Sequence, residues 1–295
     1  MNSTPLTLRE ALTAATPRLA ANPHLQPHAA RDAELLLLHT LDIPRSTLLA
    51  HPERILTPHQ HTAYQALIAR RLTLEPIQYI TGTQDFYGLT LHVTPAVLIP
   101  RPETELLVEA VLQRLPHNQP LRILDIGTGS GAIAIAIAHH LPLAHVTAVD
   151  ISPAALAVAR KNAALHQLEQ RITFLQSDLL DNLSTAPDPT HPETLFHAIL
   201  SNPPYIPDSD RTTLHPQVRD HEPSLALFSG PKGLDIYRRL IPQAHPALLR
   251  KGLLAMEIGH GQSPTIQQLL TAPWTNVHIL PDLQGIPRVA IAYKP

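Results

Sequence analysis

The chain has 295 residues, enough for one large domain or two ordinary ones with a substantial core. Hydrophobic residues make up 44% of it and charged residues 16%, and no run approaches the roughly 18 apolar residues that a membrane span needs. The start, Met1–Glu10, lacks a signal-peptide pattern, so we expect a globular cytoplasmic protein that does not enter a membrane.

The charge balance argues against a protein that works on nucleic acid. Lys and Arg total 22 against 24 Asp and Glu, a net charge of −2, whereas proteins that bind nucleic acid usually carry a basic excess. The pairs Arg70-Arg71 and Arg238-Arg239 leave room for a local basic patch. Cysteine is absent, which excludes disulfides and thiolate metal ligands. The 19 histidines contain no His-Glu-x-x-His, so we expect scattered surface histidines and no metal site.

Residues 1–75 have the pattern of a small helical bundle. Leu6–Ala21 and Ala29–Leu41 carry apolar residues at spacings of three and four. Thr57 and Gln60 form a capping box that opens a further helix towards Leu74. No chemistry is visible in this domain, so it is either a recognition module or a scaffold.

Residues 76–100 predict a β-hairpin that links the bundle to the rest of the chain. Tyr79–Thr81 and Leu89–Val93 are its expected strands, with glycines between them. The proline-flanked segment Leu98–Glu105 then leads into a helix, Thr104–Leu115, which opens a domain expected to cover residues 101–295.

From residue 121 onwards strands and helices alternate, which predicts an α/β fold with a doubly wound, mostly parallel, seven-stranded sheet beside the smaller N-terminal helical domain. The expected parallel strands are Leu121–Ile126, His145–Val149, Ile172–Gln176, His197–Ser201 and Leu253–Ile258. The expected edge hairpin is Val277–Leu280 with Val289–Tyr293, and the expected helices end near His140, Gln167, Leu249 and Thr271. Two proline-rich loops are expected, a surface loop at Ser184–Thr194 and a lid or substrate loop at Ile206–Gly233.

A glycine-rich loop follows the first of these strands. Gly127-Thr128-Gly129-Ser130-Gly131 lets the backbone turn tightly and approach a ligand where a helix begins. Asp150 ends the second strand, where a carboxylate can accept hydrogen bonds from a ribose diol; the alternative for Asp150 is a helix-capping turn residue. The loop fits a dinucleotide or S-adenosylmethionine and does not decide between them.

The fourth strand decides the cofactor. It ends in Asn202-Pro203-Pro204-Tyr205, a stiff turn that presents an amide, a bare carbonyl and an aromatic ring. Ligands of open α/β sheets bind at the carboxyl ends of strands where strand order reverses, so this turn should face the reactive end of the cofactor. A planar NH2 group would find two hydrogen-bond acceptors there, which suits methyl transfer from a sulfonium and has no use in hydride transfer.

Several stretches together resemble the release-factor glutamine methyltransferases, a family of class I S-adenosylmethionine-dependent methyltransferases. They are Pro76–Tyr79, Leu98–Glu105, Asp125–Ala138, Ser201–Ile206, Glu222-Pro223 with Ala226-Leu227, Gly233–Asp235 with Tyr237, and Glu257–Gly259. The resemblance implies a Rossmann-like fold and N5-methylation of the glutamine side-chain amide in the Gly-Gly-Gln motif of peptide chain release factors. The N-terminal helices would help to dock the release factor, and we expect a monomer.

The resemblance also implies a set of site residues. The predicted catalytic residues are Asn202, Pro203, Pro204 and Tyr205, with the Asn202 Oδ1 atom and the Pro203 carbonyl accepting the amide hydrogens and Tyr205 fixing the amide plane by packing. The predicted cofactor-binding residues are Gly127, Thr128, Gly129, Ser130, Gly131, Asp150, Asp178, Leu179 and Asn202. Two residues depart from the family pattern: Gln217 stands where an acidic residue is expected, and Leu179 where some members have an aromatic residue.

Three other functions fit parts of the pattern. An adenine-N6 or guanine-N2 methyltransferase of nucleic acid would use the same turn, but the net charge and the 4% aromatic content are against it. A silent S-adenosylmethionine-binding or ribosome-associated adaptor would not need the turn, and a nicotinamide oxidoreductase is disfavoured by it. Glu257 is expected to be a structural or loop partner, and Arg101 and Glu103 to pair with the loop near Glu222 or to hold substrate.

Overall fold

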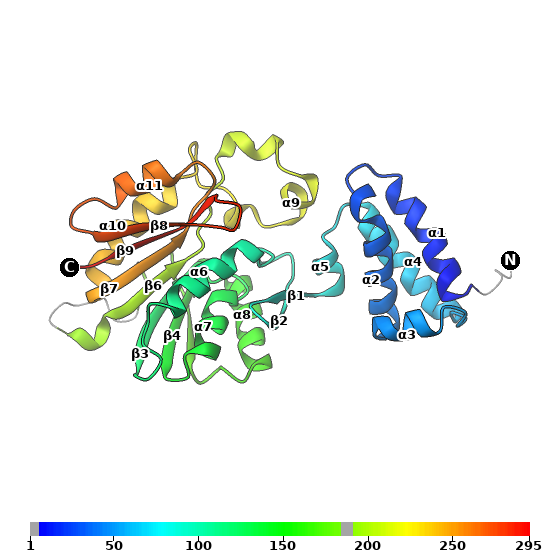
Figure 1. Cartoon of the computed structure of the whole chain (residues 1–295), viewed down its shortest axis with the longest axis horizontal. Coiled ribbons are helices and arrows are strands. Elements are labelled where there is room, and N and C mark those ends of the chain that lie inside the picture. Colours follow the sequence, from blue (N-terminus) through cyan, green and yellow to red (C-terminus); the bar gives the residue numbers. More distant parts are fainter. Residues whose placement is uncertain (1–5, 184–190) are drawn as a thin grey trace. The chain divides into compact units, whose positions relative to one another are not determined.

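The computed structural model describes residues 6–183 and 191–295, which divide into two compact units (Figure 1). Of the described residues, 6–82 and 215–221 form the first unit, and 83–183, 191–214 and 222–295 form the second. Most of the predicted surface loop Ser184–Thr194 lies outside the described residues, and its end forms the short 3-10 helix η2, Pro192–Thr194. The predicted domain limits at residues 75 and 100 stay a prediction.

The first unit is a helical bundle with its own core. Its helices are α1 (Leu8–Ala20), η1 (Gln26–His28), α2 (Ala29–Leu41), α3 (Arg45–Ala50), α4 (Pro58–Leu72) and α5 (Ile77–Thr81), with α9 (Pro216–His221) contributed from later in the chain. Leucines and alanines spaced along α1, α2 and α4 pack around the fully buried Tyr64, whose hydroxyl donates to the Ala33 carbonyl at 3.0 Å. The predicted capping box is present: Thr57 Oγ1 accepts from the Gln60 N–H and Gln60 Oε1 accepts from the Thr57 N–H.

Two predictions in this region were wrong or incomplete. Tyr79–Thr81 lies in helix α5 and not in a strand, because Pro76 sits at the N-cap and Gly82, at φ 79°, ends the helix in the left-handed conformation. The helix α3 was not predicted, since six residues are too few for a helical period to be visible. The hairpin itself is formed by β1 (Thr83–Phe86) and β2 (Leu89–His92).

The second unit is built on the predicted seven-stranded sheet, with strand order β5-β4-β3-β6-β7-β9-β8. Its strands are β3 (Leu121–Ile126), β4 (Ala144–Asp150), β5 (Ile172–Gln176), β6 (Phe196–Ser201), β7 (Leu248–Glu257), β8 (Thr275–Pro281) and β9 (Pro287–Tyr293). The first five of the order pair in parallel, and the closing hairpin is antiparallel, as predicted. Strand β7 begins five residues before the predicted Leu253 because Leu248 pairs with Phe196 across a register shift.

Helices cover both faces of the sheet (Figure 1). On one face lie α6 (Pro102–Leu112), α7 (Ala132–His140) and α8 (Pro153–Leu165), and on the other lie α10 (Asp235–Ala247) and α11 (Ser263–Leu269). The two apolar cores between helices and sheet explain why β3 and β6 are mostly apolar, since both of their faces are buried.

The central pair of the sheet, β3 and β6, forms the point where strand order reverses. The chain moves outward from β3 through β4 to β5 and then returns to β6 on the other side of β3. The carboxyl ends of β3 and β6 are therefore neighbours, with Ile126 opposite Ser201 in the register. In such sheets this crevice is the usual ligand site. Among the described residues, no helix is both long and apolar enough to cross a membrane.

Candidate active site

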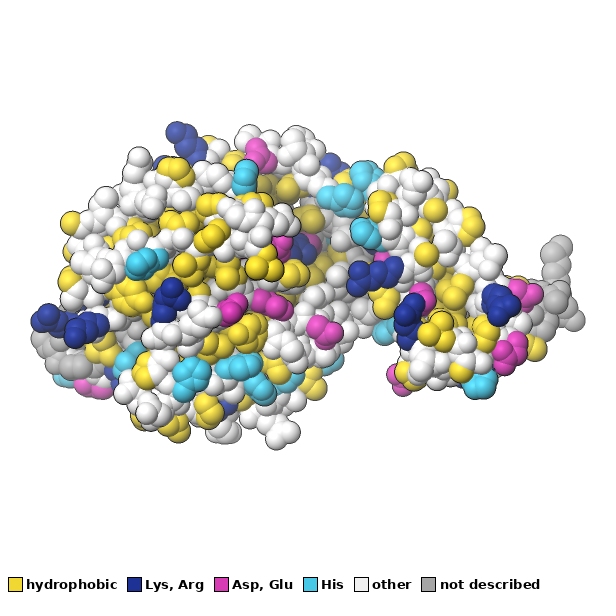
Figure 2. Space-filling model, in the orientation of Figure 1, with side chains coloured by type: hydrophobic (Ala, Val, Ile, Leu, Met, Phe, Trp, Pro, Cys, Tyr) yellow, Lys and Arg dark blue, Asp and Glu magenta, His cyan; other side chains and the backbone are white. Residues whose placement is uncertain are grey.

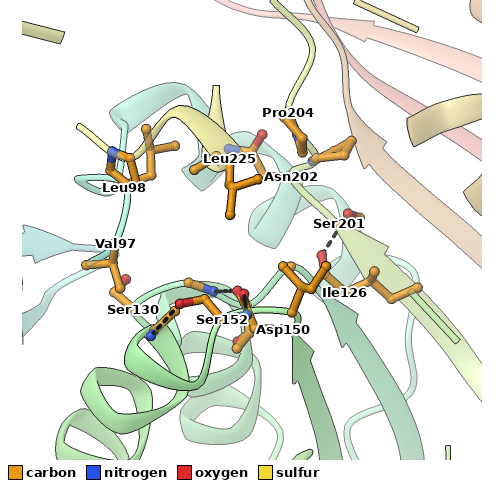
Figure 3. A pocket seen from close by; sticks show the side chains of 18 of the residues that line it. Val97, Leu98, Ile126, Ser130, Asp150, Ser152, Ser201, Asn202, Pro204 and Leu225 are labelled. Carbon is orange, nitrogen blue, oxygen red and sulfur yellow. Dashed lines mark hydrogen bonds between the residues drawn. The ribbon is translucent and has the colours of Figure 1, made fainter. Parts of the chain in front are cut away.

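A cavity of about 370 Å³ opens at the carboxyl ends of β3, β4 and β6, within the range of small-molecule sites. Figure 3 shows Ser130, Asp150 and Ser152 along one side of it and Asn202, Pro204 and Leu225 along the other. The segment from Ala96 to Arg101 and the loop around Leu225 complete the lining. The predicted substrate loop, Ile206–Gly233, therefore does contribute to the cavity, and it contains the short helices η3 (Asp208–Thr212), α9 and η4 (Ser224–Ala226).

The glycine loop has the backbone conformation that its sequence predicts. Gly127, Gly129 and Gly131 have φ values of 71°, 55° and 84°, in the left-handed region that disfavours other residues. A Cβ atom on Gly131 would lie 3.0 Å from the Ile135 side chain and 3.2 Å from the Ala159 Cβ, so this glycine also allows the loop to pack closely against α8. Together these glycines place the backbone of the loop in the cavity wall.

Asp150 lies in the cavity wall and also holds the glycine loop. Its Oδ2 atom accepts from the Gly129 N–H and its Oδ1 atom from the Ser152 N–H, both at 2.9 Å. Burial raises the pKa of the Asp150 carboxyl, although these N–H groups favour its charged form. A carboxylate oxygen has more than one acceptor site, so the capping contact and a diol contact are compatible.

Asp178 and Leu179 line the cavity next to Asp150, and their contact with a cofactor stays a prediction. Asp178 accepts a hydrogen bond from Arg239 at 2.8 Å, and Leu179 has φ 51° and is nearly buried. The predicted site residues from the glycine loop, β4 and β5 are thus gathered in one place, with the exception of Gly131, which lies behind the wall.

The turn after β6 brings its amide to the opposite wall. Asn202, Pro203 and Pro204 all line the cavity, and the Asn202 Nδ2 atom donates to Thr104 Oγ1 at 2.9 Å. Within the described part of the chain, neither Asn202 Oδ1 nor the Pro203 carbonyl takes part in a hydrogen bond that competes for it. Both acceptors are available to a ligand.

Tyr205 has a different environment from the rest of the turn. It is not among the described residues that line the cavity; its ring packs against the core between the sheet and α10, and its hydroxyl donates to Glu257 Oε1 at 3.2 Å. Burial, and then the negative charge of Glu257, raise the pKa of the Tyr205 hydroxyl. Contact of Tyr205 with a substrate amide stays a prediction.

Arg101 pairs with the loop near Glu222, as expected. Its Nη2 atom lies 2.5 Å from Glu222 Oε1, and the Ile99 N–H donates to Glu222 Oε2 at 3.2 Å. The Glu222 side chain is fully buried. This pair fixes the segment before α6 to the loop that carries Leu225, and both border the cavity.

Sequence reasoning missed two polar residues that shape the site. Asn162, fully buried on α8, donates from Nδ2 to the Ser130 and His92 carbonyls and accepts from the His92 N–H, so it ties the glycine loop to the hairpin. Thr104 contacts Asn202 across 98 positions of sequence. An asparagine inside the apolar face of a helix is a visible signal, whereas Thr104 looks like an ordinary first-turn residue.

Metal-binding side chains do not gather in the described part of the cavity wall. The described residues contain no group of three or more His, Asp or Glu side chains placed to hold a metal ion. Histidines lie at several places on the face that Figure 2 shows, and some are neighbours, since the rings of His139 and His140 lie 5.0 Å apart.

Solved structures share this fold at low sequence identity. The human METTL16 catalytic domain, solved with an RNA hairpin, has a TM-score of 0.54 at 16% identity over 82% of this chain and 84% of that chain. The 16S rRNA N2 G1207 methyltransferase of T. thermophilus, solved with AdoMet and guanosine, has a TM-score of 0.51 at 21% identity over 72% of this chain and 50% of that chain. The fold alone therefore gives a structural class, the Rossmann-like fold that these methyltransferases share.

Relatives of known family narrow this class. The chain matches the PrmC N-terminal domain over residues 10–82 and the methyltransferase small domain over residues 102–218. It is 44% identical to the release factor glutamine methyltransferase of Koribacter versatilis over 98% of this chain and 99% of that protein. It is 45% identical to the one of Moorella thermoacetica over the same shares. The chain belongs to the release factor glutamine methyltransferase family.

The cavity fits S-adenosylmethionine better than a dinucleotide. Its wall carries two carboxylates, Asp150 and Asp178, and its two arginines, Arg101 and Arg239, are each paired with an acidic side chain. No unpaired cation in the described wall therefore faces a pyrophosphate, whereas a sulfonium cation is compatible with these charges. A Cβ atom added to Gly127 or Gly129 would meet no atom closer than 4.0 Å, so the cavity is open beside this backbone and leaves room for a nucleoside. Glycine is needed at both positions because their positive φ values would strain any other residue.

Proposed function

We propose that this protein transfers a methyl group from S-adenosylmethionine to the side-chain amide nitrogen of the glutamine in the Gly-Gly-Gln motif of peptide chain release factors. Two observations support the proposal: membership of the family, and the place of the Asn202 amide in the cavity wall. The second carries the chemistry, because the Asn202 Oδ1 atom and the Pro203 carbonyl would face the substrate amide, across the cavity from the glycine loop that would hold the nucleoside.

The cofactor would be held by the glycine loop and by the acidic ends of the neighbouring strands. The backbone of Gly127–Gly129 would lie against the nucleoside, Asp150 would accept hydrogen bonds from the ribose diol, and Leu179 would cover the base. When bound, S-adenosylmethionine supplies an electrophilic methyl group on a sulfonium. The low polarity of Ile126, Val97 and Leu98 in the wall would exclude water from that methyl group.

The amide substrate needs positioning more than it needs a base. Its nitrogen lone pair is delocalised, to the extent that rotation about an amide bond costs ~18–20 kcal/mol. Asn202 Oδ1 and the Pro203 carbonyl would each accept one of the two N–H hydrogens and hold the nitrogen towards the methyl donor. Each such bond contributes about 0.5–1.5 kcal/mol, whereas near-attack geometry contributes ~7–11 kcal/mol. Orientation is therefore the main contribution of the turn.

The remaining residues of the turn support this geometry. Pro203 and Pro204 lack N–H groups and restrict the backbone, so the turn keeps its shape when the site is empty. Tyr205 would hold the turn through its ring and its bond to Glu257. Asparagine is not a base, so the proton of the methylated amide would leave to solvent from the nitrogen atom.

The N-terminal helical unit would dock the release factor. We further expect the protein to act as a monomer in the cytoplasm, where translation ends, and to make no direct contact with nucleic acid. On the face shown in Figure 2, Lys and Arg side chains lie in separate groups among the described residues and form no continuous stripe. No observation favours the nucleic-acid alternative over the protein substrate.

Transfer of a labelled methyl group tests the substrate class. The purified protein is incubated with methyl-labelled S-adenosylmethionine and, separately, with a release factor, total RNA and duplex DNA. We expect label in the release factor alone. Label in RNA or DNA, with none in the release factor, would overturn the proposal.

A further inference from the structure

A chain of three hydrogen bonds runs behind the cavity wall to Asn202. The Asn202 Nδ2 atom donates to Thr104 Oγ1 at 2.9 Å, and Thr104 Oγ1 donates to Glu257 Oε2 at 2.6 Å. The other carboxylate oxygen of Glu257 accepts from the Tyr205 hydroxyl at 3.2 Å. Thr104 is 4% exposed and Glu257 2% exposed, so water does not compete for these bonds.

The Glu257 carboxylate fixes which group donates and which accepts in this series of hydrogen bonds. An ionised carboxylate only accepts hydrogen bonds, and a threonine hydroxyl has a single hydrogen to donate. Because Thr104 gives that hydrogen to Glu257, its oxygen must accept from Asn202. The asparagine then has to turn its NH2 group towards Thr104 and its Oδ1 atom away from it.

We propose that Glu257 and Thr104 are positioning residues that set the orientation of the Asn202 amide, so that its Oδ1 atom and not its NH2 group faces the substrate. This inference rests on the function proposed above, in which Asn202 accepts a hydrogen of the glutamine amide. If the amide were reversed, an NH2 group would face another NH2 group and substrate binding would lose its acceptor. The carboxylate thus determines, through one hydroxyl, which group the active site presents.

Glu257 orients Asn202 in this way only while its carboxyl is ionised, and its surroundings affect that ionisation. Burial raises the pKa of its carboxyl, and Glu103 acts in the same direction, whereas the Thr104 and Tyr205 hydroxyls and Arg288 favour the charged form. The Tyr237 hydroxyl donates at 2.8 Å to the backbone carbonyl of Glu257 and therefore does not compete with Thr104 and Tyr205 for the carboxylate. A protonated Glu257 is able to donate to Thr104, which allows Thr104 to donate to Asn202 and the amide to reverse.

The test compares variants that differ in one hydroxyl. We call the hydrogen bonds from Glu257 through Thr104 to Asn202 the relay. Thr104→Val keeps the shape of the side chain but removes the hydroxyl that makes both bonds. We expect kcat to fall on the order of 10- to 100-fold, as for other groups that orient a site residue. Thr104→Ser keeps the hydroxyl and should restore kcat to within a few-fold of the unmodified protein. Tyr237→Phe removes a neighbouring buried hydroxyl outside the relay and should lower thermal stability without a comparable loss of kcat.

Three readouts separate positioning from a structural role. Calorimetric affinity for S-adenosylmethionine should stay within a few-fold in Thr104→Val. The NH2 protons of Asn202, followed by NMR, should exchange faster with water in Thr104→Val than in Thr104→Ser. In Glu257→Gln, whose Oε1 atom still accepts from Thr104 but does not titrate, kcat should lose the acid limb of its pH profile that the raised pKa of Glu257 predicts.

The outcomes distinguish this inference from the function on which it rests. If Asn202→Ala abolishes turnover while Thr104→Val retains it, the relay is wrong and the role of Asn202 stands. If Thr104→Ser is as impaired as Thr104→Val, the effect is one of packing and the relay is likewise overturned. If Asn202→Ala itself turns over normally, the proposed function of the turn fails.

Discussion

The Ser201 hydroxyl donates a 2.7 Å hydrogen bond to the main-chain carbonyl of Ile126, and both residues are almost fully buried. Ile126 is the last residue of β3, before the glycine loop, and Ser201 is the last residue of β6, before Asn202. One side chain therefore joins the two strand ends that present the cofactor side and the substrate side of the cavity. Replacing Ser201 therefore tests how much this hydrogen bond between the ends of β3 and β6 contributes to stability.

Ser201→Ala should destabilise the protein by about 1–3 kcal/mol, because the Ile126 carbonyl is left buried without that partner. Urea unfolding of the variant measures this loss. Ser209→Ala removes an exposed hydroxyl of the same size and should stay within about 0.5 kcal/mol of the unmodified protein. Equal stability of the two variants would mean that the strand ends do not depend on this bond.

Gly131→Ala should lower both stability and affinity for S-adenosylmethionine. Its φ of 84° strains any residue with a Cβ, at a cost of about 1–2 kcal/mol, and the new Cβ also meets Ile135 and Ala159. Gly261→Ala is a matched control, since its φ is 79° but nothing lies within 4 Å of the added atom. We expect similar strain in both variants. Calorimetry should show an affinity for S-adenosylmethionine that is about tenfold lower, or 1.4 kcal/mol, only in Gly131→Ala. A loss of affinity in both variants would contradict the steric explanation.

Asp125 should make stability depend on pH. Burial raises the pKa of its carboxyl to about 7 against an ordinary value of 3.8, although the Thr128 hydroxyl and the Ala134 N–H favour the charged form. The folded state therefore holds a proton that the unfolded state has lost, and the contribution of this group falls as pH rises from about 4 to 7. A difference of about 3 pH units corresponds to about 4 kcal/mol.

Asp125→Asn removes this titration, so the difference in unfolding free energy between the variant and the unmodified protein should move in favour of the variant across that range. Urea unfolding at several pH values measures the difference. A difference that stays constant from pH 4 to pH 8 would show that Asp125 does not titrate there.

Arg101→Ala should destabilise the loop that carries Leu225. The substitution leaves the buried Glu222 carboxylate without its charged partner. Breaking a buried pair in this way costs about 3–5 kcal/mol of stability. We expect the lower end of that range because the Arg101 side chain is 31% exposed. Adding Glu222→Gln removes the unpaired charge and should recover part of the loss. Thermal unfolding of the three variants measures both effects, and no recovery in the double variant would contradict this account of the pair.

Much of the methyltransferase fold could be predicted because its signals are local. The strands Leu121–Ile126 and Ile172–Gln176 and the helix Ala29–Leu41 have the predicted limits, since each is an apolar or periodic run closed by turn residues. The Asn202 turn and the glycine loop are local patterns of the same kind, and most of their residues line the cavity. Tyr79–Thr81 was assigned wrongly to a strand because its β-branched and aromatic residues favour one, whereas Pro76 and Gly82 bound a helix there.

The rest of the site depends on contacts that no local pattern contains. Thr104 meets Glu257 across 153 positions and Asn202 across 98. Gln217, where an acidic residue was expected, accepts from Arg71 at 2.9 Å through its amide oxygen, so an uncharged acceptor serves in that place. The position of the Tyr205 ring follows from the packing of α10 on the sheet, which the sequence of the turn does not determine.

Mass spectrometry of a release factor after incubation with this protein and S-adenosylmethionine tests the central claim most directly. The account predicts that one glutamine, in the Gly-Gly-Gln motif, gains the mass of a single methylene, and that Asn202→Ala abolishes this gain while cofactor affinity stays within a few-fold. An unmodified glutamine, a methyl group on another residue, or full methylation by Asn202→Ala would contradict it.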